Sequence, residues 1–378
     1  MRPISLSIAA MLFLSAGALA ETVDLYIGST APGPDGGIYL ASLDETTGAL
    51  SEPKKIVEFP GAGFQDLSPD GKFLLSTSKA DGKPSGQITL FSIGDDLSLT
   101  SLGNASAMGE GTCHVSFDRS GKVAMFANYG SGSVGSALIG DDGSFADSTF
   151  GKTASYFEHE GKSVNPKRQN APHAHSIYPG PDNKFAYAPD LGTDRVEIYK
   201  IDTTTGKLSH AGHAKTPPGA GPRHLKFSKD SKQVFVLNEL TTSISVFNRL
   251  PDGMLEKIQD ISTLPEEPVL EGMTCSEIRV HPNGRFVFTA NRDTQGKGND
   301  SLSVFELKDG KLERLSTVPA EVSIPRNINL SPSGKWLITG GQKSYDIAIF
   351  SVDSETGALK KVGDNIPCPG PMCYVFLP

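Results

Sequence analysis

The stretch Ser331-Pro332-Ser333-Gly334-Lys335-Trp336-Leu337-Ile338 places a polar turn directly before an apolar run, and this pattern recurs through the chain. The other copies of the turn are Ser68–Lys72, Asp118–Lys122, Gly180–Lys184, Ser228–Lys232 and His281–Arg285. Each copy is followed by two strand-like runs. After Ser331–Lys335 these runs are Trp336–Ile338 and Ile347–Phe350. Polar turns between such runs are typical of β-hairpins. The chain is therefore predicted to consist of repeated antiparallel strands.

The copies are spaced at about the length of a propeller blade. Their central residues are Gly71, Gly121, Asn183, Ser231, Gly284 and Gly334, which lie 50, 62, 48, 53 and 50 residues apart. A period near 50 residues, with several strands in each unit, predicts a β-propeller. No stretch of the sequence shows sustained helical periodicity, which argues against an α/β fold.

The two ends of the chain are predicted to meet in one blade. Six full repeats are visible, and the N-terminal segment around Leu25–Ile27 lacks a first strand. The C-terminal run Met372–Phe376 is a strand without a repeat of its own. We expect it to complete the N-terminal blade, which leaves no open edge in the ring. The prediction is an all-β fold with one seven-bladed β-propeller domain over residues 21–378.

Residues 1–20 are predicted to be an export signal and not part of this domain. Arg2 supplies a positive charge, and Ile4–Leu14 is an apolar run too short to span a bilayer. Ala18–Ala20 is a cleavage site of small residues. We expect the mature chain to begin at Glu21, to be periplasmic or secreted, and to have no membrane attachment after cleavage.

The composition narrows the range of partners. The formal net charge is −8 and the sequence has no block of Lys or Arg, which argues against nucleic acid. Four cysteines are too few for a disulfide framework, although export permits a disulfide. Cys368 and Cys373 are close enough in sequence to pair, but the two prolines between them leave this open. The cysteines do not have the spacing of a zinc site. We also expect the protein to be a monomer.

The propeller geometry is predicted to bring distant residues to one mouth of the channel. In each blade the innermost strand lines the channel and the second strand runs antiparallel to it. The start of the first strand and the end of the second therefore lie on the same face. The residues expected at the starts of inner strands are His175, Arg223, Arg326, Ser276, Cys113, Gly63 and Met372. Those expected at the ends of second strands are Asn128, Asp190, Glu239, Arg292 and Lys343.

A histidine, several cations and a glutamate at one mouth indicate an anion-binding and acid/base site. Arg223 and Arg292 are better explained by an anionic ligand than by loop carbonyls, because guanidinium binds carboxylate and phosphate bidentately. For His175 a general acid/base role is the main prediction. Glu239 could instead be only a salt-bridge partner of one arginine.

Two cofactor interpretations are weaker. His173 and His175 share a strand face and could bind a metal with Glu239 or His224, but no further ligand has a recognisable spacing. Gly130–Gly135 fits the dinucleotide-binding motif as a string, yet the run behind it reads as a strand and not as a helix. No metal or organic cofactor is therefore expected.

The combined motifs resemble the seven-bladed propeller lactonase family, whose best-known members are the bacterial propeller-type 6-phosphogluconolactonases. Fungal carboxymuconate lactonizing enzymes share its fold. The motifs are Asn165–Gln169, Pro172–Ser176, Gly219–His224, Asn238–Leu240, Ser243–Phe247 and Gly341–Ser344. The resemblance covers essentially the whole mature chain. It implies that His175, Arg223, Glu239 and Arg292 correspond to the family's site residues.

The expected activity is hydrolysis of a small anionic lactone of the sugar type. The substrate is 6-phosphoglucono-1,5-lactone or a related unphosphorylated aldonolactone, and export makes the phosphorylated one less expected. Glu239 or His175 would activate water and the other would protonate the leaving alkoxide, while Arg223 would stabilise the oxyanion. The residues expected to bind the substrate's anionic group are Arg292, Arg326, Lys343 and Asn128. The alternatives are a carboxymuconate-type cycloisomerase and a non-catalytic periplasmic binding propeller.

Overall fold

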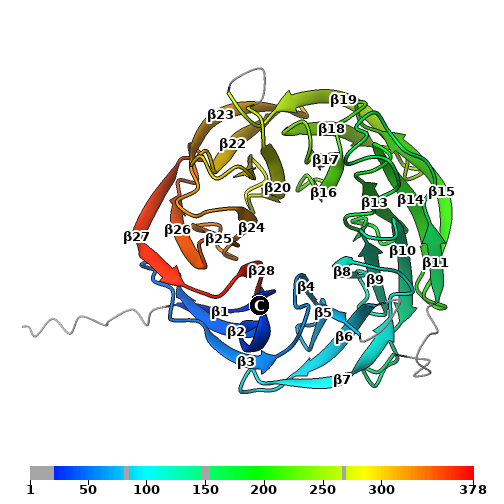
Figure 1. Ribbon diagram of the computed structural model, residues 1–378, viewed down its shortest axis with the longest axis horizontal. Helices are drawn as coiled ribbons and strands as arrows, with labels where there is room; N and C mark the ends of the chain where they lie inside the picture. Colours follow the sequence, from blue (N-terminus) through cyan, green and yellow to red (C-terminus); the bar gives the residue numbers. More distant parts are fainter. Residues whose placement is uncertain (1–20, 81–84, 146–153, 266–269) are drawn as a thin grey trace, which may run out of the picture.

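The strands form a ring of blades around a central channel (Figure 1). The computed structural model describes residues 21–80, 85–145, 154–265 and 270–378, and the predicted export signal lies outside these residues. Within the described residues there are seven four-stranded antiparallel sheets and one helical turn, the 3-10 helix η1 at Gly33–Asp35. The prediction of an all-β, seven-bladed propeller is confirmed.

The strands of the first four blades follow, from the innermost outward. Blade 1 contains β28 (Pro371–Phe376), β1 (Thr22–Ser29), β2 (Gly37–Asp44) and β3 (Lys54–Glu58). Blade 2 contains β4 (Gln65–Leu67), β5 (Phe73–Lys79), β6 (Gly86–Ile93) and β7 (Leu99–Ser106). Blade 3 contains β8 (Thr112–Phe117), β9 (Val123–Asn128), β10 (Ser133–Leu138) and β11 (Ser155–Glu158). Blade 4 contains β12 (Tyr178–Pro179), β13 (Phe185–Asp190), β14 (Arg195–Asp202) and β15 (Lys207–Lys215).

The remaining three blades have the same order. Blade 5 contains β16 (Pro222–Phe227), β17 (Gln233–Asn238), β18 (Ser243–Arg249) and β19 (Leu255–Ser262). Blade 6 contains β20 (Met273–Val280), β21 (Phe286–Asp293), β22 (Ser301–Lys308) and β23 (Lys311–Pro319). Blade 7 contains β24 (Pro325–Leu330), β25 (Trp336–Gly341), β26 (Asp346–Val352) and β27 (Leu359–Pro367).

The two ends of the chain close the ring as predicted. Strand β28 pairs with β1 and so supplies the inner strand of blade 1. Blades 7 and 1 are also joined by Trp336, whose indole Nε1 donates a hydrogen bond to the Glu45 carbonyl at 3.1 Å. The indole ring covers Gly48, where φ is +76° and a side chain would collide with the ring. Burial of such a large side chain contributes about 1.5–3 kcal/mol.

The recurring turn connects the first and second strands of six blades. Its six central residues, Gly71, Gly121, Asn183, Ser231, Gly284 and Gly334, all have a positive φ, between 59° and 80°. This left-handed conformation favours glycine, which explains why four of the six are glycine. The sequence pattern therefore marked a backbone requirement of the fold.

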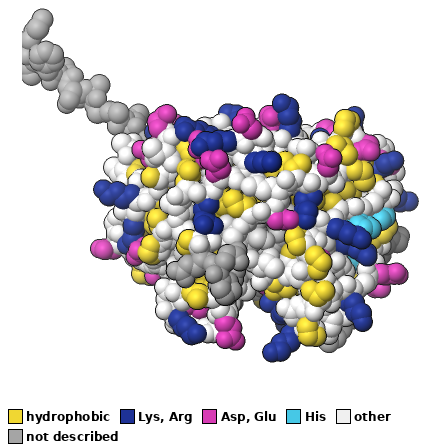
Figure 2. All heavy atoms as spheres, turned by 90° about the horizontal axis from the view of Figure 1, so that it is seen from above, with side chains coloured by type: hydrophobic (Ala, Val, Ile, Leu, Met, Phe, Trp, Pro, Cys, Tyr) yellow, Lys and Arg dark blue, Asp and Glu magenta, His cyan; other side chains and the backbone are white. Residues whose placement is uncertain are grey.

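Apolar side chains fill the space between neighbouring blades. Phe286 and Phe288 of blade 6, for example, pack with Leu337 and Phe350 of blade 7. All four cysteines are free, so the pairing of the last two that the sequence left open does not occur. Nowhere in the described ranges is there a helix of sufficient length and hydrophobicity to cross a membrane. Figure 2 shows positive and negative side chains interspersed over the visible face.

Candidate functional site

Five inner strands carry a β-bulge at the position that the repeat predicted for the channel mouth. In β16, Pro222 pairs with Asn238 and His224 pairs with Leu237, so Arg223 is the extra, unpaired residue. The corresponding residues of the other strands are Cys113, Ser276, Arg326 and Met372. A bulge bends the strand and redirects a side chain, which is why bulges are frequent next to active sites.

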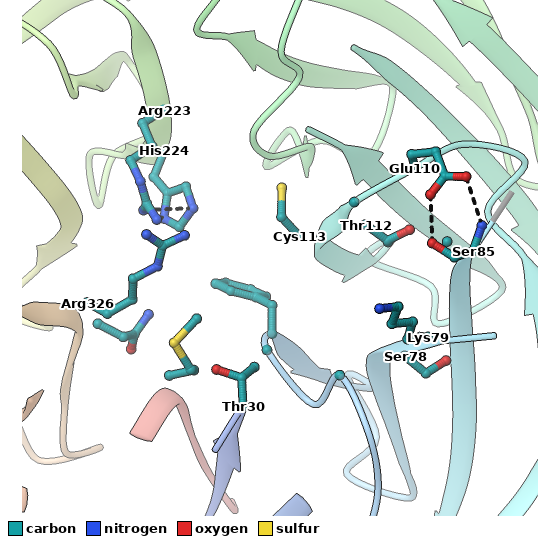
Figure 3. Close-up of a pocket in the computed structure, with 17 residues that line it drawn as sticks. Thr30, Ser78, Lys79, Ser85, Glu110, Thr112, Cys113, Arg223, His224 and Arg326 are labelled. Atoms are coloured by element: carbon teal, nitrogen blue, oxygen red, sulfur yellow. Dashed lines mark hydrogen bonds between the residues drawn. The ribbon is translucent and has the colours of Figure 1, made fainter. Parts of the chain in front are cut away.

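Four of these five bulge residues, Cys113, Arg223, Arg326 and Met372, line a cavity of about 450 Å³. Figure 3 shows Arg223, His224 and Arg326 on one side of it, with Cys113 between them and the opposite wall. The labelled residues of that wall are Ser78, Lys79, Ser85, Glu110 and Thr112, and Thr30 lies between the two sides at the bottom of the view. Guanidinium groups facing a wall rich in hydroxyls suit a ligand with one carbonyl or anionic group and several hydroxyls.

Glu239 lies among Arg168, Arg223, Arg292 and Arg326, which together form the arginine cluster. It follows β17 directly, and its backbone N–H donates to the Gly221 carbonyl, which fixes it beside the bulge of β16. Its Oε2 lies 3.1 Å from Arg223 Nε and 3.1 Å from Arg292 Nη2. Its Oε1 accepts a hydrogen bond from Arg168 Nη2 at 2.7 Å. The structure thus brings Arg223, Glu239 and Arg292 together as predicted and adds a third arginine.

These contacts determine the protonation state of Glu239. Burial alone would raise the pKa of its carboxyl, but Arg292, Arg223 and Arg168 outweigh burial and hold that pKa well below the usual range. The carboxylate is therefore ionised at any physiological pH and is a weak base. Its geometry suits an anchor for guanidinium groups better than a proton acceptor.

His175 lies at the edge of this cluster in the loop before β12. It is buried, and its Nδ1 lies 3.9 Å from the Sγ of Cys113, which lines the cavity. Its ring makes edge contacts with His224 and Tyr129. None of the described residues forms a hydrogen bond with Nε2, and His175 itself is not among the residues that line the cavity. Burial, and then the positive charge of Arg223, holds the pKa of His175 well below 6.5, so the imidazole is neutral and can accept a proton.

Arg326 is the cation of the cluster that is not neutralised by a contact. It lines the cavity, and none of the described residues forms a hydrogen bond or an ion pair with its guanidinium. Burial and the nearby charges of Arg223 and Arg292 lower its pKa from 12.5 to about 9. An unpaired guanidinium in such a place is suited to an anionic ligand.

Two predicted anion-binding residues lie elsewhere. Asn128 is fully buried, and its two amide N–H groups donate to the Ala107 carbonyl and the Ser133 hydroxyl. It therefore has no donor left for a ligand and serves the blade. Lys343 lies in an exposed turn after β25 and is not among the residues that line the cavity. Neither residue is brought to Glu239.

Two residues beside the cluster were not singled out from the sequence. Arg168 lies in the loop between β11 and β12 and also contacts the Tyr129 hydroxyl at 3.1 Å. Tyr129 stacks on His173, with ring centroids 4.5 Å apart. The sequence did contain a signal for this loop. The repeat step that includes it is 62 residues long, whereas the other steps are 48 to 53 residues, so its additional residues must form structure outside the repeat.

The His173 and His175 pair does not have the surroundings of a metal site. His173 Nδ1 lies 2.9 Å from the Tyr129 carbonyl oxygen, a partner that fixes its ring. Across residues 21–80, 85–145, 154–265 and 270–378, His, Cys, Asp and Glu side chains form no group of three suited to a metal ion.

Comparison with known proteins places these observations in a family. The family model described as "Lactonase, 7-bladed beta-propeller" matches residues 24–376. The 6-phosphogluconolactonase of Bacillus subtilis is 32% identical over 356 residues, which cover 93% of this chain and 97% of that protein. The 6-phosphogluconolactonase of Formosa agariphila is 27% identical, covering 92% and 97%. The structure of the periplasmic gluconolactonase of Pseudomonas aeruginosa has the same fold, with a TM-score of 0.86, 24% identity and coverage of 95% and 99%.

Proposed function

Because the chain belongs to the family of seven-bladed β-propeller lactonases and is a lactone hydrolase, we propose that it opens a small anionic lactone of the sugar type at the arginine cluster. The substrate is 6-phosphoglucono-1,5-lactone, which yields 6-phosphogluconate, or a related unphosphorylated aldonolactone. The observation that carries the proposal is the neutral imidazole of His175 next to Arg223, which lines the cavity and is held there by Glu239. We further propose that the enzyme is exported and acts as a monomer.

In the proposed reaction His175 is the general base. Its Nε2 takes a proton from a water molecule while the water oxygen bonds to the lactone carbonyl carbon. The carbonyl oxygen becomes an oxyanion, which accepts hydrogen bonds from the guanidinium of Arg223. The ring C–O bond then breaks, and the proton on His175 passes to the leaving alkoxide. Water is the only co-reactant, and the reaction proposed here requires no cofactor.

The other arginines divide into two roles. Arg168 and Arg292 are held by Glu239, which keeps the positive charge in place without a ligand. Arg326 has no such partner, and we assign it to the anionic group of the substrate. The hydroxyls opposite, including those of Ser85 and Thr112, suit the hydroxyl groups of an aldonolactone.

The test is an assay of the purified mature chain, residues 21–378, with phosphorylated and plain aldonolactones. Proton release above the spontaneous rate is the expected result, and His175→Ala should lower kcat by about 10²–10⁴-fold. The matched control is His213→Ala, because His213 is exposed on the outer strand β15. Loss of carboxymuconate absorbance without lactone opening would instead identify a cycloisomerase. Tight binding without turnover would identify a binding propeller.

A further inference from the structure

The channel is closed at its middle by a buried layer of side chains. Phe64 and His114 pack together in this layer, with ring centroids 4.2 Å apart. His224 Nδ1 lies 3.1 Å from Glu277 Oε2, and the same oxygen accepts a hydrogen bond from Asn327 Nδ2 at 2.6 Å. Each of these residues comes one position after the residue that the repeat aligns at the first mouth. The cavity described above therefore lies on one side of this layer.

A second cavity, of about 600 Å³, lies on the other side of the layer, at the second mouth of the channel. Of the described residues, Phe64 alone lines both cavities. The second cavity is lined by the residues three positions after the aligned ones, which lie about 10 Å further along each inner strand. These residues include Asp66, Tyr178, Lys226, Arg279 and Val375.

Two cations of the second cavity have no anionic partner. Lys226 is partly buried, and its Nζ lies over the ring of Tyr178, 4.1 Å from the centroid. None of the described residues forms a hydrogen bond or an ion pair with Lys226 Nζ or with the guanidinium of Arg119. Both residues also line an adjoining hollow. Because Arg279 is paired through Nη1 with Glu277 at 2.6 Å, Lys226 and Arg119 are the cations left to bind an anion.

Asp66 supplies a carboxyl group to the same cavity. Its Oδ2 accepts a hydrogen bond from the Phe117 N–H at 2.8 Å, and none of the described residues forms an ion pair with it. Burial raises the pKa of Asp66 to about 6, while burial and then Arg279 lower the pKa of Lys226 to about 7. The other charged or titratable groups around these two are Tyr178, Glu277, Cys373, Arg119 and Asp118. An anion in the cavity favours the protonated forms of both Lys226 and Asp66, so its binding takes up protons near pH 7.

The opposite side of the second cavity is apolar. Lys226 belongs to blade 5, and blades 1 and 2 lie across the ring from it (Figure 1). These two blades contribute Leu67, Val375 and Phe376, which are partly exposed and line the cavity. A cation that faces apolar side chains across a cavity suits a ligand with an anionic head and an apolar body.

We propose that the second mouth of the channel binds a small organic acid, with its carboxylate at Lys226 and its apolar body against Leu67, Val375 and Phe376. Arg119 adds positive charge to the same cavity. The apolar side favours an organic acid over inorganic phosphate, which has no apolar surface to bury. This site goes beyond the proposed function, because the buried layer separates it from the lactone cavity and its ligand undergoes no reaction.

The direct test is calorimetric titration of the mature chain with benzoate, phenylacetate and hexanoate. At least one acid should bind with a Kd of about 1 mM or tighter, and Lys226→Met should weaken this binding about 10-fold. Lys229→Met is the matched control, since Lys229 is exposed in the turn after β16 and lines neither cavity. Arg326→Met, at the first mouth, should also leave the affinity unchanged. The proposal is overturned if none of the three acids binds, or if folded Lys226→Met binds as tightly as the wild type.

A second set of measurements uses the wild type alone. The affinity for the acid should rise as pH falls from 8 to 6, and titrations in buffers with different heats of ionisation should show proton uptake at pH 7. Benzamide keeps the ring of benzoate but lacks its charge and should not bind. Equal binding of benzamide and benzoate, or binding without proton uptake, would contradict the proposal. These results are independent of turnover, so a wild type that opens no lactone would defeat the proposed function and leave them unchanged.

Discussion

Glu239 Oε2 and Arg223 Nε lie 3.1 Å apart, with both side chains buried at the mouth of the channel. This contact joins the residue that ends one strand to the bulge residue of the strand beside it. A carboxylate so placed keeps several guanidinium groups close together that would otherwise repel one another. The site can therefore present positive charge to a substrate before the substrate arrives, which is a requirement for electrostatic stabilisation of an oxyanion.

The first prediction concerns the charge of Glu239. Glu239→Gln should destabilise the fold by about 3–5 kcal/mol, because it leaves buried arginines without their partner. It should also reduce turnover. Chemical denaturation at pH 7 and the lactone assay measure the two effects. A stable variant with full activity would show that Glu239 is dispensable.

The second prediction concerns acid stability and follows from the sign of the same pKa shift. The folded pKa of Glu239 lies below its ordinary value of 4.5. The stability gained from its ionisation is therefore complete above pH 4.5 and is lost as pH falls through the lower folded pKa. Thermal unfolding between pH 3 and pH 7 should show a steeper loss of stability below pH 4.5 in the wild type than in Glu239→Gln. Parallel curves would contradict this.

The third prediction is the pH dependence of catalysis. The neutral form of His175 is the active base, and burial together with Arg223 lowers its pKa well below 6.5. The acidic limb of the kcat/KM profile should therefore lie below pH 6.5, with a constant rate from there to neutral pH. The profile should be measured with correction for spontaneous lactone opening. A limb centred at or above pH 6.5 would exclude His175 as the base.

The fold was predictable because its requirements are local and repeated. The turn between the first two strands needs one residue with positive φ, and glycine at Gly71 or Gly334 marks that residue in the sequence. Once the turns are aligned, the length of each strand fixes where its inner end lies. This is why Arg223 and Arg326, in different blades, were correctly placed at one mouth.

The site was predictable only where it follows the repeat. Arg168 lies in an irregular loop without an equivalent in other blades, so alignment assigns it no position. Glu277 and His224 do follow the repeat, 53 residues apart, one position after the aligned bulge residues. Their contact runs between blades and depends on side-chain rotamers. Asn128 shows the opposite case, since it has the predicted place at the end of β9 but its amide is used within the blade.

The fourth prediction tests which of the two cations Arg326 and Lys343 binds the anionic group of the substrate. Arg326→Met should raise KM for an anionic lactone by about 10-fold, which corresponds to about 1.4 kcal/mol, with kcat little changed. Its melting temperature should be equal to or above that of the wild type, because Arg223 and Arg292 repel Arg326. Lys343→Met is the control and should leave both KM and stability unchanged, as its side chain is exposed. A raised KM in Lys343→Met alone would reverse the assignment.

The fifth prediction tests the turn that defines the repeat. Ser231 has a φ of 63°, a conformation that is strained for residues with a Cβ atom, so Ser231→Gly should stabilise the fold by about 0.5–1 kcal/mol. Asn183 occupies the same place in blade 4 with a φ of 59°, but its amide donates to Asp118 Oδ2 and its Oδ1 accepts from the Arg119 N–H. Asn183→Gly should therefore destabilise the fold, because two hydrogen bonds to blade 3 are lost. Urea unfolding of both variants measures the two changes in the free energy of unfolding. Equal changes would mean that the backbone φ alone determines which residue is favoured at this turn.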